Sequence, residues 1–366
     1  DMDIRKVAVA GATGQVGRAV VAALRDSGHE AVELSRAGGV DVLAGDGLDE
    51  ALAGADVVVD VLNTAATDPK DTVGFFTGTS DQLLAAEQRA GVRHHVLLSI
   101  VNVDATPDNA HYAGKIAQEE RVRSGPVPWT ILRATQFHSF AEMVAGWTTA
   151  NGVATVAPLL VQPVDVGDVA AVLAELAVGS PQGQAPDLAG PDTLDLVDMA
   201  IRTFAARGDS TTVRASWRDS PFGVFMAGEV LLPGPGARIG GTSFSDWLAR
   251  DAGDPRALAT KYFEAWLAHD FGRVRTLLAD DATFSGPLGT ASSGDECVAG
   301  LEGMSKMMTG LDITRMVVDG PDVMTWYDLL TQEAPPTPTV NWMHVEDGLI
   351  RQIRATFDPR AILGDG

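Results

Sequence analysis

The sequence has little cysteine and few aromatic residues: Cys297 is its only cysteine, and aromatic side chains make up 6% of the 366 residues. A single cysteine cannot form an internal disulfide bond, which is typical of a protein from a reducing compartment. Long apolar runs are also lacking, because Gly, Asp or Arg interrupts each run well before the roughly 18 residues that a membrane span requires. No charged segment with an apolar core follows the first residues, so we expect a cytoplasmic protein without a secretory leader or a membrane partner.

Basic residues are scarce as well. The chain has 27 Lys and Arg residues against 49 Asp and Glu residues, which gives a formal net charge of −22. A nucleic-acid partner needs a basic face, so this composition argues against one. A small anionic ligand stays compatible with it, because backbone amides and a few arginines are enough to bind such a ligand. The 7 histidines are dispersed without metal-ligand spacing, so no metal site is expected.

A glycine-rich stretch near the N-terminus carries the strongest signal. Residues 4–36 read IRKVAVAGATGQVGRAVVAALRDSGHEAVELSR. An apolar run typical of a buried parallel strand leads into three spaced glycines, and a helix and a second apolar strand follow. In such a βαβ unit Gly11 permits the tight turn, Gly14 lets a pyrophosphate approach the backbone, and Gly17 allows close packing of helix on strand. The stretch therefore predicts a dinucleotide-binding fold, with the helix N-terminus facing the phosphates.

The end of the second strand bears on the choice of dinucleotide. NAD sites usually have an acidic residue there, which binds the ribose 2′-hydroxyl. Ser35 and Arg36 stand at this position instead, and a hydroxyl with a guanidinium suits a 2′-phosphate better. Glu33 is acidic but lies within the strand. We therefore expect NADP(H) as the cofactor, with Asp46 in a later loop placed to hold the adenine amino group.

Further α/β units follow over the first two-thirds of the chain. Residues 39–63 predict two strands around a short helix, residues 80–100 predict a helix and a strand, and residues 127–137 predict one more strand. The expected fold class is a Rossmann-like, doubly wound parallel sheet. Ligands bind outside the carboxyl ends of such strands, which makes pocket candidates of the polar residues there: Asn63, Ser99 and Gln136.

A tyrosine and a lysine stand close together in DNAHYAGKIAQEERV, residues 108–122, which reads as the start of a helix. Dehydrogenases that reduce carbonyl groups often use such a pair four residues apart, because the lysine lowers the tyrosine pKa and the tyrosine protonates the substrate oxygen. Here Tyr112 and Lys115 are three residues apart, and His111 holds the position four before the lysine. His111 could donate the proton, Tyr112 could donate it, or a quinone-like acceptor could take it from water. Alternatively, both rings only pack or cap the helix.

The chain from about residue 4 to residue 250 resembles the NmrA-like branch of the atypical short-chain dehydrogenase/reductases. The resemblance rests on GATGQVG, the strand ending at Ser99, the helix with Lys115, and PWTILRATQF, while VQPVDVGDVAAVLAELA, DLAGPDTLDLVDMA and FSDWLA look like the small substrate lobe of that family. It implies that Lys115 holds the nicotinamide ribose and that residues after Ser99 and after Arg133 border the substrate. The expected cofactor-binding set is Gly11, Thr13, Gly14, Gln15, Val16, Gly17, Ser35, Arg36, Asp46, Asn63 and Lys115. The expected catalytic candidates in this part are Ser99, His111, Tyr112 and Lys115.

The last third of the chain predicts a second, smaller domain. Asp254 and Pro255 read as the N-cap and the first residue of a helix. The apolar face of this helix consists of Leu258, Tyr262, Phe263, Trp266 and Leu267. Further helices and a meandering antiparallel sheet follow, and Asp347-Gly348 marks a hairpin between the last two strands. This order suggests a curved sheet wrapped around helices, an α+β cone.

The second domain resembles the SnoaL-like domains of the nuclear-transport-factor-like superfamily, on YFEAWLAHDFGRVRTLLADDATFSGPLG and VEDGLIRQIRATFD. That family includes polyketide cyclases, isomerases and modules that only bind or dimerise, so a homodimer is expected. The general-base aspartate and the histidine of the cyclases would stand at Ala355 and Ile353, which weakens the cyclase interpretation. Asp328 and His344 remain acid–base candidates if they line the cone, because burial there would shift their pKa values. A register error of one residue would reverse the face on which they lie, so a surface or interface position stays open.

Three functions are compatible with the sequence. The favoured one is an NADPH-dependent reductase of a carbonyl or quinone-like small molecule, an intermediate of polyketide-type secondary metabolism. Its reductase domain would span residues 1–250, and a fused SnoaL-like domain, residues 255–366, would shape or further convert the substrate. The second is an NADP-sensing binding protein without turnover. The third is a cyclase or isomerase that works in the cone.

Overall fold

The computed structural model of the chain describes residues 4–105, 109–332, 334–346 and 348–360. They form two compact units. The N-terminal unit comprises Asp1–Thr203 and Thr211–Trp247, and the C-terminal unit comprises Phe204–Ser210 and Leu248–Gly366. The domain boundaries expected at residues 250 and 255 stay a prediction.

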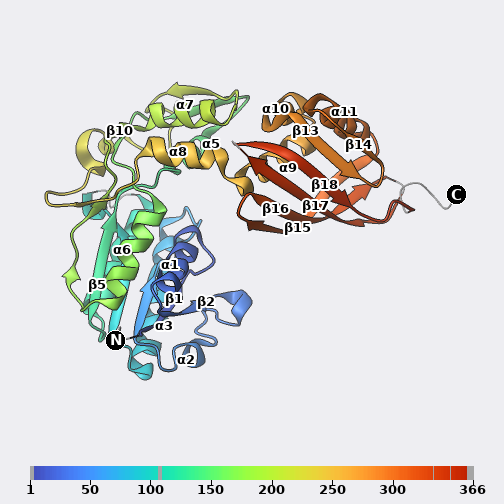
Figure 1. The fold of residues 1–366 in the computed structure, drawn as a ribbon. Helices are drawn as coiled ribbons and strands as arrows, with labels where there is room; N and C mark the ends of the chain where they lie inside the picture. The colour runs from blue at the N-terminus through green and yellow to red at the C-terminus, as the bar shows by residue number, and fades with distance from the viewer. Residues whose placement is uncertain (1–3, 106–108, 333, 347, 361–366) are drawn as a thin grey trace. The chain divides into compact units, whose positions relative to one another are not determined.

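A parallel sheet with the strand order β12-β9-β5-β4-β3-β1-β2 forms the centre of the N-terminal unit, and β8 pairs beside β5 (Figure 1). Its strands are β1 (Lys6–Ala10), β2 (Glu30–Leu34), β3 (Val57–Asp60), β4 (His94–Ile100), β5 (Trp129–Ala134), β8 (Gly183–Gln184), β9 (Leu188–Ala189) and β12 (Arg238–Ile239). The helices and helical turns beside it are α1 (Gln15–Asp26), η1 (Arg36–Gly38), α2 (Leu48–Ala51), α3 (Pro69–Ala90), η2 (Val103–Ala105), α4 (Ala110–Ser124) and α6 (Val166–Val178). The expected doubly wound α/β class is confirmed.

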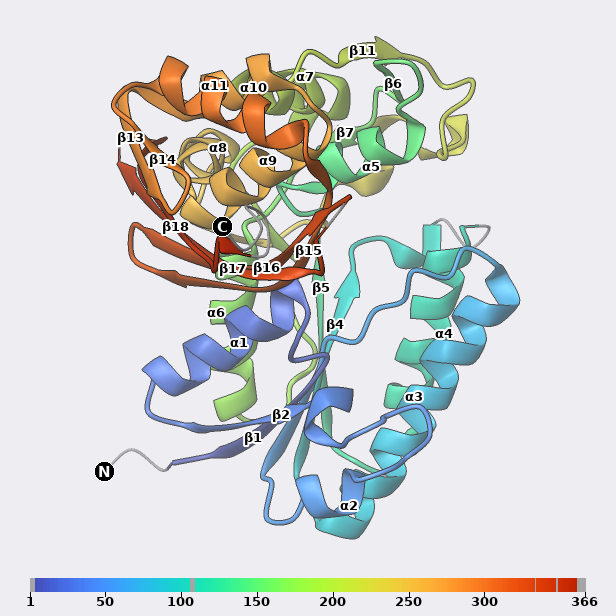
Figure 2. The same cartoon turned by 90° about the vertical axis from the view of Figure 1, so that its right-hand side faces the viewer.

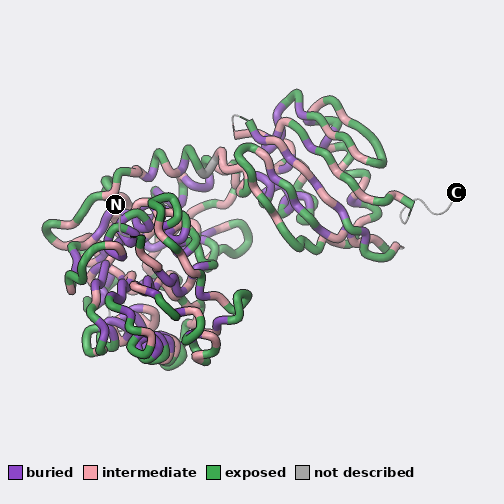
Figure 3. Tube along the Cα trace, turned by 60° about the horizontal axis from the view of Figure 1, so that its bottom comes forward, coloured by how far each residue is buried: buried purple, intermediate pink, exposed green. Residues whose placement is uncertain are grey.

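Helices cover both faces of this sheet. Successive strand residues point to opposite faces, so Val7 and Val9 of β1 pack in one apolar cluster with α1 and α6. Ala8 and Ala10 belong to a second cluster with Leu83 of α3. Figure 2 shows α1 and α6 on one side of the strands and α3 and α4 on the other, and Figure 3 shows buried residues gathered in the interior of the N-terminal unit. Burial on both faces explains why the strands read as continuous apolar runs.

Residues 40–47, all of them described, form turns in place of the strand expected at the start of residues 39–63, so that prediction was wrong. Gly45 and Gly47 have φ angles of 84° and 72°, in the left-handed region. The Asp41 carboxylate accepts hydrogen bonds from two following backbone amides and closes the turn. The two valines of this segment are buried in the core, which is why the apolar pattern resembled a strand.

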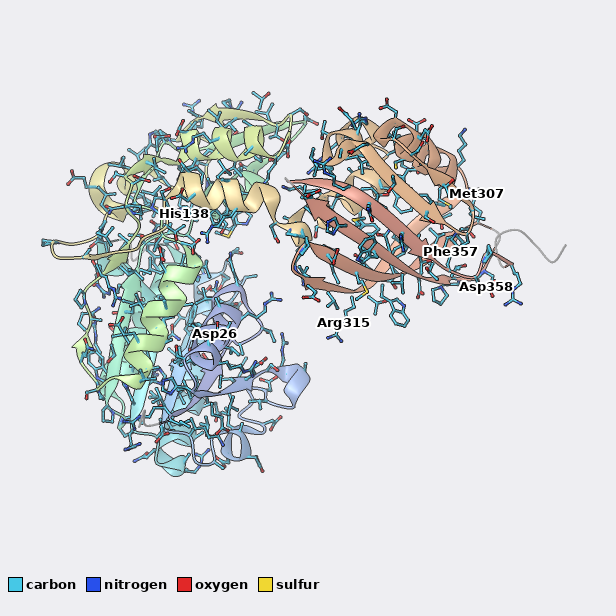
Figure 4. The ribbon with its side chains drawn as sticks, in the orientation of Figure 1. Asp26, His138, Met307, Arg315, Phe357 and Asp358 are labelled. Atoms are coloured by element: carbon cyan, nitrogen blue, oxygen red, sulfur yellow. The ribbon has the colours of Figure 1, made fainter. Side chains whose placement is uncertain are left out.

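A small lobe, as expected for this fold class, completes the N-terminal unit. Its elements are α5 (Phe140–Thr148), β6 (Val153–Val156), β7 (Leu160–Val161), β10 (Leu194–Asp195), α7 (Leu196–Ala206), β11 (Thr212–Ala215), η3 (Val224–Met226), η4 (Gly228–Leu231) and α8 (Phe244–Gly253), of which the last residues of α7 and α8, from Phe204 and from Leu248 on, belong to the C-terminal unit. Strand β6 pairs with β11, and β7 pairs with β10. An aromatic cluster ties the lobe to the sheet, because the His138 ring lies 5.7 Å from the ring centroids of both Phe244 and Trp247 (Figure 4).

The C-terminal unit packs helices against a sheet with the strand order β14-β13-β18-β17-β16-β15. Its helices are α9 (Pro255–Leu267), α10 (Phe271–Leu277) and α11 (Gly294–Ser305), and its strands are β13 (Leu278–Gly286), β14 (Gly289–Ala291), β15 (Met308–Asp319), β16 (Asp322–Thr331), β17 (Thr337–Glu346) and β18 (Leu349–Thr356). Strands β13 and β18 pair in parallel, which differs from the expected antiparallel meander. Register shifts in β13, in β15 and between β17 and β18 bend the sheet, so the expected curved α+β architecture is confirmed (Figure 1).

The helix α9 begins as expected, because the Asp254 carboxylate accepts hydrogen bonds from two first-turn amides and Pro255 follows it. The side chains of its expected apolar face are buried except for Leu267, which is 41% exposed. The expected Asp347-Gly348 hairpin lies partly outside the described residues, since Asp347 is not among them.

The sheet face away from these helices is partly apolar. Met324 and Trp326 are 50% and 56% exposed on β16, and Arg315 of β15 is exposed as well (Figure 4). The expected homodimer stays a prediction.

A buried ion pair fixes α4 against β5 and provides a test of the fold. Arg133 donates to the two carboxylate oxygens of Glu119 at 2.9 and 2.7 Å, and the Glu119 side chain is 2% exposed. The pair raises the pKa of Arg133 further above its ordinary value. We expect Arg133→Met to lower the free energy of unfolding of the N-terminal unit by about 3 kcal/mol, because it leaves a buried carboxylate with a weaker partner.

Urea unfolding followed by circular dichroism measures this effect. The matched control is Arg121→Met, which removes an exposed arginine of α4 whose ion pair with Asp81 spans 3.4 Å. We expect the control to cost less than about 1 kcal/mol. Equal losses of unfolding free energy in both variants would contradict the stabilising role of the buried Arg133–Glu119 ion pair.

Candidate functional site

The turn between β1 and α1 has the geometry of a dinucleotide-binding turn. Gly11 has a φ of 85°, and a Cβ atom there would lie 2.9 Å from the Val61 carbonyl oxygen. A Cβ atom at Gly17 would lie 2.1 Å from the Gly11 carbonyl oxygen, so only glycine lets the helix approach the turn this closely. The tight turn at Gly11 and the close packing at Gly17 are thereby confirmed.

The N-terminus of α1 offers a place for an anion. Gly14 is the N-cap residue and contributes no side-chain hydrogen bond to the first turn. Thr13, Gly14 and Gln15 are exposed, whereas Val16 packs into the core. First-turn N–H groups have no intrahelical partner, and they carry the positive end of the helix dipole. This backbone therefore fits the pyrophosphate of a dinucleotide.

The end of β2 presents a cation. Ser35 caps η1 by accepting a hydrogen bond from the Gly38 amide at 3.2 Å, and Arg36 beside it is exposed. The Glu33 carboxylate lies 3.0 Å from the Arg25 guanidinium, so this acidic side chain of β2 is engaged by another arginine. An exposed arginine next to a hydroxyl fits a 2′-phosphate.

Asp46 and Asn63 are also exposed, in the loops after β2 and β3. The Asp46 carbonyl oxygen accepts a hydrogen bond from the Asp41 amide, which closes the turn described above. The Asn63 side-chain oxygen accepts one from the Thr64 amide at 2.9 Å. Their roles as cofactor ligands stay predictions.

A buried polar cluster lies at the carboxyl ends of β4 and β5. Ser99 pairs with Arg133 across the two strands, and Gln136 follows β5. The Gln136 Nε2 donates to the Tyr112 hydroxyl oxygen at 3.3 Å. Ser99 Oγ and Gln136 Oε1 are buried without a hydrogen-bond partner among the described residues. Buried polar atoms are normally paired, so this cluster has hydrogen-bonding capacity left for a ligand.

Tyr112 and His111 differ sharply in their electrostatic surroundings. Burial raises the pKa of Tyr112 to about 12, so its hydroxyl keeps its proton at neutral pH. Burial and the nearby Lys115 charge lower the pKa of His111 to about 4, so its imidazole is neutral at the same pH. The His111 ring packs edge-on against Phe76, with ring centroids 5.7 Å apart.

Lys115 of α4 is 5% exposed and contacts β4, the strand that contains Ser99. Its Nζ donates to the Leu98 carbonyl oxygen at 2.6 Å, directly before Ser99, and lies 5.0 Å from the centroid of the Phe76 ring. Burial lowers the pKa of Lys115 to about 8, against the opposing effect of nearby carboxylates. An ammonium group at this depth needs fixed partners.

The position of α4 is set locally. The Asn109 side-chain oxygen accepts hydrogen bonds from the amides of His111 and Tyr112, so the helix begins at Ala110 and both rings stand in its first turn. A Cβ atom at Gly114 would lie 2.6 Å from the Phe76 ring, so this glycine lets α4 approach α3 closely.

Asp60 and Gln118 are functional candidates that the sequence analysis missed. Asp60 ends β3 and is fully buried, and Gln118 is fully buried three positions after Lys115. The sequence contained a signal for each. Asp60 is a carboxylate at the end of the apolar run VVVD, and Gln118 lies three positions after Lys115 and therefore on the same face of the helix.

Asn102 was missed for a different reason. It adopts a φ of 50°, and its Nδ2 donates to the carbonyl oxygens of Val230 and Leu232 at 3.0 and 2.6 Å. These bonds hold a segment of the lobe against the end of β4. No local pattern predicts them, because the partners are about 130 positions away.

In the C-terminal unit, aromatic rings fill the space between the sheet and its helices. The Phe263 ring lies 5.4 Å from both the Tyr262 and the Tyr327 ring. Burial raises the pKa of Tyr327, whose hydroxyl is hydrogen-bonded to Asn341 on the neighbouring strand. Ile353, at the position of the cyclase histidine, packs into the same core.

Asp328 and His344 lie on the other face of that sheet. Each stands between two buried neighbours along its strand, so the alternation of strand residues directs both side chains away from the core. The His344 Nδ1 lies 2.7 Å from the Asp322 carboxylate, and its ring stacks on Trp342. This placement does not support acid–base chemistry inside the cone, and that role stays a prediction.

No group of three or more His, Cys, Asp or Glu side chains among the described residues is arranged to hold a metal ion. None of the helices in the part of the chain that the structure describes is both long and apolar enough to cross a bilayer.

Comparison with known proteins assigns both parts of the chain. Residues 11–178 match the family described as NAD(P)H-binding, and residues 259–353 match the SnoaL-like domain. The chain is 34% identical over 205 residues to a (4-alkanoyl-5-oxo-2,5-dihydrofuran-3-yl)methyl phosphate reductase of Streptomyces griseus, an alignment that covers 51% of this chain and 69% of the relative.

Solved structures resemble each unit separately. A dTDP-4-dehydrorhamnose reductase of Bacillus anthracis, in complex with NADP, is 15% identical, with a TM-score of 0.49, over 65% of this chain and 91% of that one. An NTF2-like protein of unknown function from Cytophaga hutchinsonii is 24% identical, with a TM-score of 0.28, over 30% of this chain and 94% of that one. From the family matches and the reductase relative, the chain belongs to the NmrA-like NAD(P)H-binding reductases, as an oxidoreductase that carries a SnoaL-like domain after its NAD(P)H-binding domain.

Proposed function

We propose that the protein is an NADPH-dependent reductase of a small molecule with a carbonyl or quinone-like group. The observation that carries the proposal is the buried cluster of Ser99, Tyr112 and Gln136 near Lys115, whose unpaired polar atoms suit the oxygen of such a substrate. The cluster follows the carboxyl ends of β4 and β5, where open α/β sheets bind their ligands.

NADPH rather than NADH is proposed because of the end of β2. Arg36 is exposed there beside Ser35, while Glu33 is engaged by Arg25. When bound, the nicotinamide would supply a hydride to the substrate carbon.

Tyr112 is proposed as the proton donor to the substrate oxygen. Its hydroxyl is protonated at neutral pH and lies within the polar cluster, whereas the neutral imidazole of His111 packs on Phe76. Ser99 would donate a second hydrogen bond to the same oxygen, and the Lys115 ammonium would stabilise the negative charge that develops there. With a hydride supplied to the carbon, the proton from Tyr112 on the oxygen would balance the two-electron reduction.

The substrate class is proposed from the relative. By its name, that reductase acts on a phosphate ester with an alkanoyl and an oxo group on an unsaturated ring. We place the substrate of this chain among comparable carbonyl intermediates of secondary metabolism, of the polyketide type. The SnoaL-like domain would shape or further convert that substrate.

The cofactor proposal predicts a selective effect of Arg36→Ala. NADPH affinity should fall about tenfold or more, because a charge-assisted hydrogen bond to the 2′-phosphate is lost, and NADH affinity should stay unchanged. Isothermal titration calorimetry with both nucleotides measures this. The matched control is Arg89→Ala, another exposed arginine, which pairs with Asp49 on α2. Equal weakening of both nucleotides would count against a 2′-phosphate contact.

The proton-donor proposal predicts different outcomes at neighbouring positions. Tyr112→Phe should lower kcat about 100-fold or more and leave NADPH binding unchanged, because it removes only the acidic hydroxyl. His111→Gln should leave kcat largely unchanged. NADPH consumption with a panel of quinones and unsaturated ketones provides the measurement. The reverse ranking of the two variants would make His111 the donor.

The pKa values predict the pH profile of the wild-type protein. Lys115 is mainly protonated below pH 8 and loses its charge above it, so kcat/KM should be flat between about pH 6 and 7 and fall about tenfold per pH unit above about pH 8. His111 titrates near pH 4 and should produce no step between pH 5 and 7. A step near pH 6.5 would indicate an exposed, titrating histidine and contradict this assignment.

A further inference from the structure

The ammonium group of Lys115 is held by neutral oxygens. Its Nζ donates to the Leu98 carbonyl oxygen and to the Gln118 side-chain oxygen. No carboxylate of the described residues lies within ion-pair distance of it, although the side chain is 5% exposed. A buried ammonium group without a contacting carboxylate depends on its hydrogen bonds for its position.

Gln118 joins this ammonium group to a carboxylate. Its Nε2 donates to Asp60 Oδ2 at 2.9 Å, while the other Asp60 oxygen accepts from the Leu62 amide at 3.0 Å. The amide can stand only one way round, because an ammonium group needs an acceptor and a carboxylate needs a donor. Gln118 and Asp60 are both fully buried, so the hydrogen bond between their side chains is shielded from bulk water.

Two other carboxylates of the neighbouring helices are paired with side chains other than Lys115. Glu119 of α4 faces Lys115 electrostatically, but its oxygens accept from Arg133 and from Arg123. Glu87 of α3 is paired with His95 of β4 at 2.8 Å.

The other groups that face Lys115 carry no negative charge. They are the neutral His111 of α4, the Phe76 ring of α3 and the paired His95 of β4. The charge of Asp60 raises the pKa of His95, and the charge of Lys115 lowers it. Asp60 is thus the one carboxylate linked to Lys115 through a hydrogen-bonded bridge within the described residues.

We propose that Gln118 and Asp60 are positioning residues of the reductase site, which hold the Lys115 ammonium group near Ser99 and keep it charged for its ligand. The inference rests on the proposed function, in which Lys115 stabilises negative charge on the substrate oxygen. An ammonium group has three N–H donors, and Leu98 and Gln118 take two of them. The third is left for a ligand, and the Gln118 bridge determines its direction.

The test is a titration of Lys115 that needs neither cofactor nor substrate. The chain has five lysines, so a protein labelled with [13C]lysine gives few Cε signals, and Lys115→Met identifies the one from Lys115. The midpoint of its titration should fall by about one pH unit or more in Gln118→Met, which loses a hydrogen bond to the charged form.

Asp60→Asn is the second variant, because it removes the charge and keeps the shape if Gln118→Met fails to fold. It should also lower the midpoint, since an opposite charge that favours the ammonium form is lost. Gln162→Met is the matched control: it removes a glutamine whose Nε2 donates to the Gly190 carbonyl oxygen in the lobe, and the midpoint of Lys115 should stay unchanged.

Activity then separates this inference from the proposed function. The fall of kcat/KM at high pH should move to lower pH by the same amount as the midpoint in both variants. An unchanged midpoint would overturn the positioning role by itself. A midpoint that moves while the pH profile does not would overturn the proposed role of Lys115 in reduction and leave the hydrogen-bonded bridge intact.

Discussion

The buried charge of Lys115 is the constraint on which the N-terminal unit depends. An ammonium group removed from water depends on fixed hydrogen-bond partners, and β4 and α4 supply two of them, while β3 supplies the carboxylate that holds one of these partners in place. The sheet order places β3 directly beside β4, so Asp60 comes within reach of a helix that follows β4 in sequence. The same residues that satisfy the charge also bring it to the carboxyl edge, where Ser99 and Tyr112 stand.

Local patterns predicted those parts of the fold that local chemistry decides. Gly11 and Gly17 predict a tight turn and a close contact between helix and turn, because a larger residue would clash there. Asp254 predicts the start of a helix, because its carboxylate accepts hydrogen bonds from the first-turn amides. The segment 40–47 misled the same reasoning, because its buried valines have the pattern of a strand while its glycines and Asp41 fix a turn.

The features that the sequence did not predict depend on contacts between residues far apart along the chain. The hydrogen bond between Gln118 and Asp60 joins residues 58 positions apart, and no periodicity relates them. The face of Asp328 and His344 depended on strand register, and the alternation of buried and less buried residues along β16 and β17 resolves it. The parallel pairing of β13 with β18 likewise joins the first and the last strand of the C-terminal unit in sequence order, which a run of hairpins does not predict.

The structure imposes two requirements on the residue at position 102, which is an asparagine. Its backbone adopts the left-handed conformation, which glycine, asparagine and aspartate tolerate best, and its side chain must donate to two carbonyl oxygens of the lobe. Glycine satisfies the first demand and has no donor, while aspartate offers only acceptors to those carbonyls. Asparagine meets both, so backbone and side chain together restrict the residues that fit where the lobe is fastened to the sheet, even though this position lies outside the proposed chemistry.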